Sequence, residues 1–298
     1  MKQIDSLQYD AVNALTEDEI RVIKDVVFQK DLNVNLAGKT LIPVRQVPNG
    51  LRSAGFQRVR TSEDDTIEDG IVATCTDFPS ISVDGVETPV PIQQFGRSFR
   101  IPNKDILSSR MTPGMPLDTT YVESAKMIVD NDVDRYVWFG STRLGIEGIQ
   151  NNSANATYTA TTWDTDPYSD LRLALNEMDE EFAGRNYAFI SSRANISEMY
   201  IRDSSTGDPM LKWIKEQLSI TPYIDKFFEA YAPNEGLLMP LGKDIAEIRQ
   251  AEPQQVELEY RSAHHRAWEG ILFEEMGIAH YRPEACVRID GLTFPVPV

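Results

Sequence analysis

The stretch that most constrains the fold is residues 117–140, which carry the pattern of one long amphipathic helix. Apolar side chains recur there every three or four residues, as on a helix with one buried face. Charged side chains fall on the opposite face, which we expect to meet solvent. A straight helix of about 20 residues spans roughly 30 Å, so it is long enough to support several other elements. The apolar positions are Tyr121, Val122, Ala125, Ile128, Val129, Val133 and Tyr136, and the charged ones are Glu123, Lys126, Asp130 and Asp134.

Both ends of this helix carry patterns of their own. Thr120 and Glu123 fit a capping box, in which each side chain binds a free backbone amide of the first turn. At the other end we expect the helix to finish at Trp138, Phe139 and Gly140.

The charge balance argues against a protein that grips nucleic acid. The formal net charge is −17, whereas proteins that grip nucleic acid neutralise phosphates with a basic patch. The chain has one modest basic grouping, which flanks a predicted hairpin and consists of Arg58, Arg60, Arg97 and Arg100. The acidity favours solubility. It is also compatible with a container whose negative wall leaves enclosed DNA mobile.

The sequence shows no pattern of a membrane span, a secretory signal, a disulfide framework or a cysteine metal site. No apolar run is long enough for a membrane span, and the first residues lack the apolar core of a secretory signal. Cys75 and Cys286 lie far apart and form no Cys-x-x-Cys pair. The sequence therefore predicts neither a disulfide framework nor a zinc site, and the reduced cytosol is the expected setting.

Residues 57–101 are predicted to form one long β-hairpin. Asp84-Gly85 is a strong two-residue turn signal, and the prolines on either side exclude a central position in a large sheet. A long hairpin with few large apolar residues is not stable alone. We therefore expect it to contact another subunit. The candidate contact residues are Phe78, Ile81, Val83, Val86, Val90, Ile92, Phe95 and Arg97.

The remaining elements are predicted from periodicity and turn residues. A helix with an apolar stripe precedes an extended arm, and a surface loop follows the long helix. A compact α/β unit and a strand-rich tail complete the chain. Their ranges are 17–27 for the first helix, 36–56 for the arm, 150–166 for the loop, 167–242 for the α/β unit with its opening helix to about 182, and 256–289 for the tail.

No grouping of side chains predicts an enzyme. His264 and His265 with Glu269 could bind a metal on a helix, but this region has a β-like composition and His280 is not a convincing third ligand. Glu274 and its neighbour Glu275 would point to opposite faces of a strand, so solvation or a subunit salt bridge is expected for them. Residues 140–145 superficially suggest a phosphate loop but lack the Gly-Lys-Ser/Thr ending. The sequence predicts no cofactor.

The order of these elements resembles the major capsid proteins of tailed double-stranded DNA viruses of the Hong Kong 97 type, and the related encapsulin shells. Three segments carry the resemblance. They are the helix end from Val129 to Gly140 with Gly145-Ile146-Glu147-Gly148-Ile149, the turn Leu237-Leu238-Met239-Pro240-Leu241-Gly242-Lys243-Asp244-Ile245, and the terminal Arg282-Pro283-Glu284-Ala285-Cys286-Val287-Arg288-Ile289.

The resemblance implies an α+β fold with an N-terminal arm, an extended loop, a peripheral domain and an apical domain. It places the N-terminal helix and arm at 1–56, the extended loop at 57–101 and the apical domain at 167–242. The peripheral domain then comprises 102–166 and 243–298, with the spine helix at 117–140. No lysine occurs between Lys39 and Lys104, so the lysine crosslink that some family members form from this loop is not expected.

The resemblance further implies a structural protein without enzyme activity. Copies would form pentamers and hexamers of an icosahedral capsid, assembled in the host cytoplasm, that encloses double-stranded DNA without sequence-specific binding. Scaffolding, portal and cement proteins are possible partners, with scaffolding either supplied by a separate chain or dispensable, and no membrane is involved. The alternatives are an encapsulin-type compartment that sequesters a cargo enzyme and, more distantly, a metal-dependent enzyme using His264 and His265.

Overall fold

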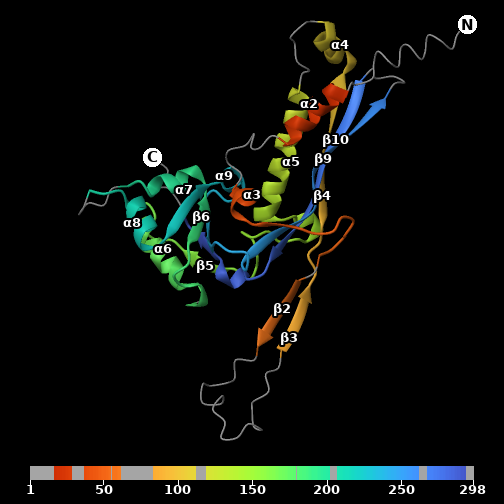
Figure 1. Ribbon diagram of the computed structural model, residues 1–298. Coiled ribbons are helices and arrows are strands. Elements are labelled where there is room, and N and C mark those ends of the chain that lie inside the picture. The colour runs from red at the N-terminus through yellow and green to blue at the C-terminus, as the bar shows by residue number, and fades with distance from the viewer. Residues whose placement is uncertain are drawn as a thin grey trace, which may run out of the picture.

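Two β-sheets and one long helix organise the chain (Figure 1). The computed structural model describes residues 17–28, 37–54, 56–61, 83–111, 119–178, 180–201, 207–261 and 267–292. One continuous hydrophobic core contains side chains of the long helix and of both sheets, among them Val133, Phe189 and Leu272. The sheets are therefore packed into a single body.

The long helix is α5 (Thr120–Phe139), which confirms the predicted helix within the described residues. Its apolar stripe is buried, as expected, but the stripe is narrower than predicted because Tyr121 and Ile128 are exposed. The predicted capping box is not formed. The N-cap is Thr119, which makes no side-chain bond to a helix amide, and its Oγ1 instead donates to Glu123 Oε1 at 2.8 Å.

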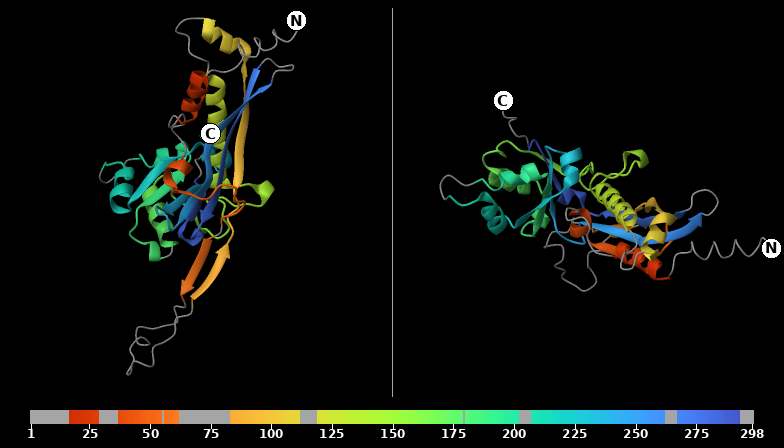
Figure 2. Two further views of the ribbon diagram at one scale, coloured as in Figure 1. Left: turned by 45° about the vertical axis from the view of Figure 1, so that its right-hand side comes forward. Right: turned by 90° about the horizontal axis from the view of Figure 1, so that it is seen from above.

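The first sheet has four strands in the order β1-β9-β10-β4. Strands β9 (Ala246–Arg261) and β10 (Ala267–His280) form its antiparallel centre. Strand β1 (Val44–Gln46) adds in parallel to β9, and β4 (Gln93–Pro102) adds antiparallel to β10. Helix α5 packs along β4 and β10, as the left view of Figure 2 shows.

Three shorter helices belong to this half of the molecule. Helices α2 (Glu17–Phe28) and α3 (Ala37–Leu41) pack on α5. Helix α4 (Asn103–Met111) follows β4 directly. The predicted first helix is confirmed over its described length, whereas the predicted arm contains α3 and β1 and thus joins the core.

The second sheet has five strands in the order β5-β11-β8-β6-β7. Every residue of β8 and β6, two of its three inner strands, is buried, which explains their continuous apolar sequence. The strands are β5 (Ala156–Thr159), β6 (Tyr187–Ser191), β7 (Ile220–Ile224), β8 (Gly236–Pro240) and β11 (Val287–Asp290). The predicted surface loop thus contains a strand, and the sheet draws β5 and β11 from outside the predicted 167–242 unit.

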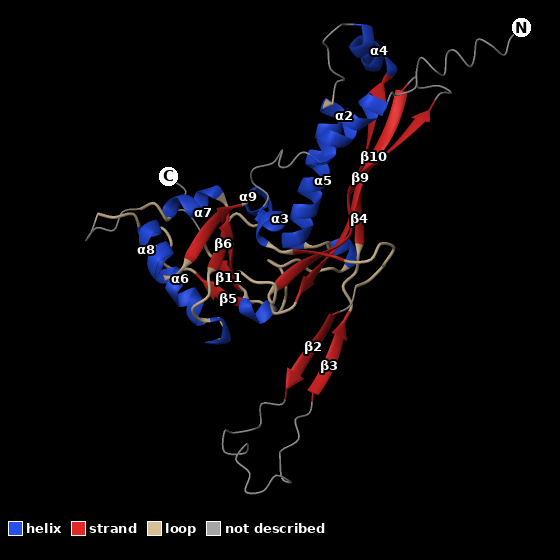
Figure 3. Ribbon diagram, in the orientation of Figure 1, coloured by secondary structure: helices blue, strands red, loops and turns tan. Residues whose placement is uncertain are grey.

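Four short helices accompany this sheet (Figure 3). They are α6 (Pro167–Asn176), α7 (Arg193–Glu198), α8 (Met210–Gln217) and α9 (Lys226–Tyr231), and three 3-10 turns lie at Thr142–Leu144, Glu180–Phe182 and Pro283–Ala285. Helix α6 ends before the predicted position near 182, and α9 was not predicted. Among the described helices, none has the length and apolar composition that crossing a bilayer requires.

The segment 57–101 is not one hairpin. Strand β2 (Phe56–Thr61) pairs with β3 (Val83–Thr88), but β4 pairs with β10 instead. The predicted turn at Asp84-Gly85 is wrong, because both residues lie inside β3 opposite Arg60 and Val59. Residues 62–82, which join the two strands, lie outside the described part of the chain. The β2–β3 hairpin projects from the body (Figure 1).

Candidate assembly site

The end of the spine helix α5 is the point where the two halves of the molecule meet. Trp138 is fully buried, and its Nε1 donates a hydrogen bond to Asp225 Oδ2 at 3.1 Å. Asp225 is also the N-cap of α9, because its Oδ1 accepts from Phe227 N at 2.8 Å. Phe139 packs its ring 5.4 Å from that of Phe228, centroid to centroid. The predicted aromatic end of the helix therefore attaches α5 to α9.

Gly140 ends the helix in a conformation that only glycine adopts readily. Its φ is 62° and its ψ is −148°. A Cβ at this position would lie 2.1 Å from Ile146 O and 2.5 Å from Gly148 N. The chain returns tightly here because Ile149 N and Gln150 N donate to two carbonyls of the last helical turn, at 3.0 and 2.8 Å. These bonds satisfy acceptors that a helix end otherwise leaves free.

A buried pair of carboxyl groups lies beside this junction. Asp134 of α5 is fully buried, and its Oδ1 accepts from Gly38 N of α3 at 2.7 Å. Burial and the neighbouring carboxylate of Asp225 raise the pKa of Asp134 to about 9. Protonated Asp134 can donate to Asp225, whereas Asp225 accepts from Trp138 and Phe227. The proton on Asp134 thus removes the repulsion between the two buried carboxyl groups, and residues from α3, α5 and the start of α9 can share one polar cluster.

We expect the stability of the protein to fall as the pH rises because of Asp134. The folded state holds this proton up to about pH 9, whereas an unfolded aspartic acid loses it near pH 4. Between these values the folded state binds more protons, so the free energy of unfolding decreases by up to about 1.4 kcal/mol per pH unit. In Asp134→Asn the amide takes the place of the protonated carboxyl, and this decrease should disappear.

Denaturant unfolding of both proteins at pH 6 and pH 8 measures the effect. The difference in unfolding free energy between Asp134→Asn and wild type should grow in favour of the variant at pH 8. An equal difference at both pH values would show that Asp134 does not carry the proton.

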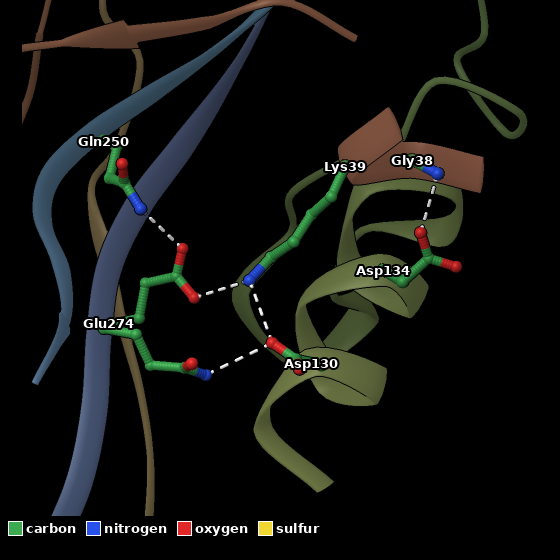
Figure 4. A network of polar contacts seen from close by, with 7 residues as sticks. Gly38, Lys39, Asp130, Asp134, Gln250 and Glu274 are labelled. Carbon is green, nitrogen blue, oxygen red and sulfur yellow. Dashed lines mark hydrogen bonds and ion pairs between the residues drawn. The ribbon is translucent and has the colours of Figure 1, made fainter. Parts of the chain in front are cut away.

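An ion-pair network ties α3 to α5 and to the first sheet (Figure 4). Lys39 Nζ lies 2.7 Å from Glu274 Oε2 and 3.1 Å from Asp130 Oδ1. Gln250 Nε2 donates to Glu274 Oε1 at 2.7 Å, and Gln254 Nε2 donates to Asp130 Oδ1 at 3.2 Å. Although burial lowers the pKa of Lys39, the two carboxylates raise it above its ordinary value overall. Glu274 therefore has a partner within its own chain rather than a subunit salt bridge.

The predicted hairpin contact residues divide into three groups. Phe78 and Ile81 lie outside the described residues, and Val83 and Val86 lie on β3. The other four are engaged within their own chain. Val90 is buried and Ile92 is partly buried. Phe95 packs edge-on against Tyr136 at 5.0 Å, and Arg97 pairs with Asp132 at 2.5 Å. Phe95 and Arg97 belong to β4 of the four-stranded sheet and contact the spine helix, whereas Val90 and Ile92 precede this strand.

An open groove of about 590 Å³ lies between the first half of β4, the last two turns of α5 and the turn that follows Gly140. Its described lining residues include Arg97, Arg135, Arg143 and one acidic residue, Asp132. Tyr231 of α9 closes one side, with the guanidinium carbon of Arg135 6.0 Å from its ring centroid. This arginine groove is a basic feature among the described residues of an acidic chain.

The side chains that were considered and rejected as metal ligands are not brought together in the described residues. His264 and His265 lie outside the described part, and Glu269 lies in β10. His280 is partly buried beside Cys286, with Nε2 3.5 Å from Sγ, and desolvation lowers its pKa to about 4. The described chain contains no group of acidic, histidine and cysteine side chains that could hold a metal ion.

Two features of the junction were missed from the sequence. Asp130, Asp134 and Lys126 were assigned to a solvent-facing side of the helix, but all three are buried. Nothing in their spacing indicated this, because the partners come from distant segments. Helix α9 carried a local signal, since Asp225 is a favoured N-cap residue before an aromatic helix.

Comparison with known proteins gives a consistent result. A profile of the family described as major capsid protein matches residues 69–221. No curated protein matches the chain significantly. Several solved structures are similar to this chain at low sequence identity.

One of them is the virus-like particle from Pyrococcus furiosus, with 13% identity, a TM-score of 0.65, and coverage of 92% of this chain and 99% of that chain. The capsid of Myoviridae phage XM1 shows 10% identity, a TM-score of 0.68, and coverage of 88% and 94%. Mycobacterium phage Bobi shows 10% identity, a TM-score of 0.63, and coverage of 87% and 91%.

The spine helix, the projecting hairpin and the two sheets thus define a capsid protein of the Hong Kong 97 fold, as the resemblance predicted. The family profile covers about half of the sequence. The chain belongs to the major capsid protein family, and its role is that of a structural shell protein.

Proposed function

We propose that the chain assembles into a closed icosahedral viral capsid of pentamers and hexamers that encloses double-stranded DNA. Membership of the major capsid protein family carries this proposal. The β2–β3 hairpin supports it, because a two-stranded hairpin that leaves the body needs a partner surface. Many small interfaces repeated by symmetry then add up to a stable shell.

Each of the two sheets belongs to a different domain of the proposed shell protein. In our proposal, α5 and the four-stranded sheet form the rigid peripheral domain, within 102–166 and 243–298. The five-stranded sheet and its helices, centred on 167–242, form the apical domain that meets its copies at the centre of each capsomer. The β2–β3 part of 57–101 reaches a neighbouring subunit. The net charge of −17 suits a wall that encloses DNA without binding a particular sequence.

The proposed viral shell also implies other partner proteins and a place of assembly. We propose assembly in the host cytoplasm, with portal, scaffolding and cement proteins as separate partners. An encapsulin-type compartment that holds a cargo enzyme is the second candidate. The similarity to the virus-like particle from Pyrococcus furiosus, which covers 99% of that chain, favours keeping it.

Size-exclusion chromatography and electron microscopy of the purified chain test the shell. We expect closed particles under some assembly condition, and a folded monomer under all conditions would contradict the proposal. The contents distinguish the two candidates. Particles isolated from their native source should contain nuclease-protected DNA, whereas co-purification of one enzyme without DNA would favour the compartment.

The hairpin's role can be tested without damaging either sheet. Because Thr61 pairs with Val83 in register, residues 62–82 can be replaced by an Asn-Gly turn. Deleting 76–95, in contrast, would remove the start of β4, which pairs with β10. We expect the shortened chain to keep its circular dichroism spectrum and unfolding midpoint but to lose closed particles. Normal particles from the shortened chain would overturn the role of this segment.

A further inference from the structure

The arginine groove is built as a recognition surface. Arg97 is held by Asp132, and Arg135 is positioned by Tyr231. Arg143 is exposed on the turn that follows the spine helix. Three arginine residues therefore line one open groove with a single acidic side chain among its described lining residues. Such an arrangement selects a ligand that carries several carboxylates.

The same groove offers apolar and backbone contacts. Leu144 and Tyr231 line it and are 47% and 57% exposed. Strand β4 is an edge strand of its sheet, since β10 pairs along one side of it and no other described strand pairs along the other. An extended peptide could thus place acidic side chains on the arginines and apolar side chains on Leu144 and Tyr231, beside the edge of β4.

One segment of the chain has the complementary composition. Residues 62–82 contain six acidic side chains and no lysine, arginine or histidine. The same segment contains four apolar β-branched side chains. The acidic residues are Glu63, Asp64, Asp65, Glu68, Asp69 and Asp77, and the apolar β-branched ones are Ile67, Ile71, Val72 and Ile81.

The position of this segment in the chain favours a second copy as its receptor. It joins Thr61 and Val83, the paired ends of a hairpin that projects away from the body (Figure 1). Half of its length, about ten residues, can span up to about 33 Å when extended. The hairpin and this segment together can therefore extend far from the body of their own chain.

We propose that residues 63–69 of one copy bind the arginine groove of a neighbouring copy. This inference rests on the proposed shell and names the contact that its hairpin makes. In a chain with a net charge of −17, like charges repel between subunits, so a local pairing of opposite charges fixes which surfaces meet.

Charge reversal tests the contact from both sides. Arg135→Glu with Arg143→Glu reverses the groove, and Glu63→Lys with Glu68→Lys reverses the segment. We expect each pair to reduce the yield of closed particles at least tenfold at low ionic strength. The chain with all four substitutions should recover at least half of the wild-type yield. Failure of this recovery, or normal yields from both pairs, would overturn the proposal.

A matched control separates the local contact from the net charge. Arg172 of α6 and Arg193 of α7 are exposed and do not line the groove. Arg172→Glu with Arg193→Glu changes the net charge as much as the groove variant does. Its particle yield should stay within twofold of wild type, and an equal loss would show that total charge, not the groove, controls assembly.

Disulfide trapping shows which copies are joined. In a Cys75→Ser background, Leu144→Cys and Glu68→Cys are combined in one chain, while Cys286 stays buried. Oxidised particles should give a ladder of covalent oligomers on a denaturing gel. Bonds formed only within one chain, or no bonds at all, would contradict binding between copies. Closed particles of the background protein would still support the shell, so the two proposals can fail separately.

Discussion

Replacing Gly140 with alanine is expected to lower the free energy of unfolding by about 4 kcal/mol. The φ of 62° and ψ of −148° lie in a region that costs other residues about 1–3 kcal/mol. The new Cβ would also meet Ile146 O at 2.1 Å and Gly148 N at 2.5 Å. Both atoms belong to backbone, which relieves a clash only by moving, and such overpacking costs about 1–3 kcal/mol. Denaturant unfolding followed by tryptophan fluorescence measures the loss.

Gly145, five residues further on, provides the matched control. Its φ of 65° is also positive, but no atom lies within 4 Å of where a Cβ would stand. Gly145→Ala should therefore cost about 1 kcal/mol, the conformational penalty alone. An equal loss of stability in both variants would show that the close approach of the chain at residues 146–148 is not the reason for a glycine at position 140.

Replacing Lys39 with methionine should destabilise the protein by about 3 kcal/mol. The substitution leaves Glu274, which is 2% exposed, and the buried Asp130 without their shared cation. Removing one partner of a buried ion pair costs about 3–5 kcal/mol, and the partial exposure of Lys39 favours the lower end. Because the pKa of Lys39 is raised above the ordinary lysine value, Lys39 is charged at both pH 6 and pH 8, and the loss should be equal at these two pH values.

Two further variants identify the cause. Adding Glu274→Gln to Lys39→Met removes the unpaired charge and keeps the acceptor for Gln250, so it should restore part of the lost stability. Lys212 pairs with Asp208 on the surface of α8, and Lys212→Met should cause no measurable change. A double variant as unstable as Lys39→Met alone would show that packing of the lysine stem, not its charge, matters.

The elements that could be predicted from the sequence are those with a strong local pattern. The spine helix follows from its helical period, and β6 and β8 follow from short continuous apolar runs. The prediction of a turn at Asp84-Gly85 was wrong although the local sequence signal is strong. In the structure, pairing with β2 places both residues inside β3, so the partner strand decided the conformation.

The polar cluster at the junction could not be predicted because its members are distant in sequence. Lys39 and Glu274 are separated by 235 residues, and Asp134 and Gly38 by 96. A helical pattern places polar residues opposite an apolar stripe and therefore outside the core. Here a second layer, formed by α3 and α9, covers that face, and burial then depends on partners that spacing along the chain does not reveal.

The pairing of the four-stranded sheet also sets when this protein can fold during its synthesis. Its outer strands β1 and β4 leave the ribosome early, yet both pair only with β9 and β10, residues 246–280. The sheet therefore stays incomplete until most of the chain has been translated, and its late closure is slow because the contacts are distant in sequence. A nascent chain consequently lacks the rigid frame on which a partner could dock, so translation itself delays association until each copy is complete.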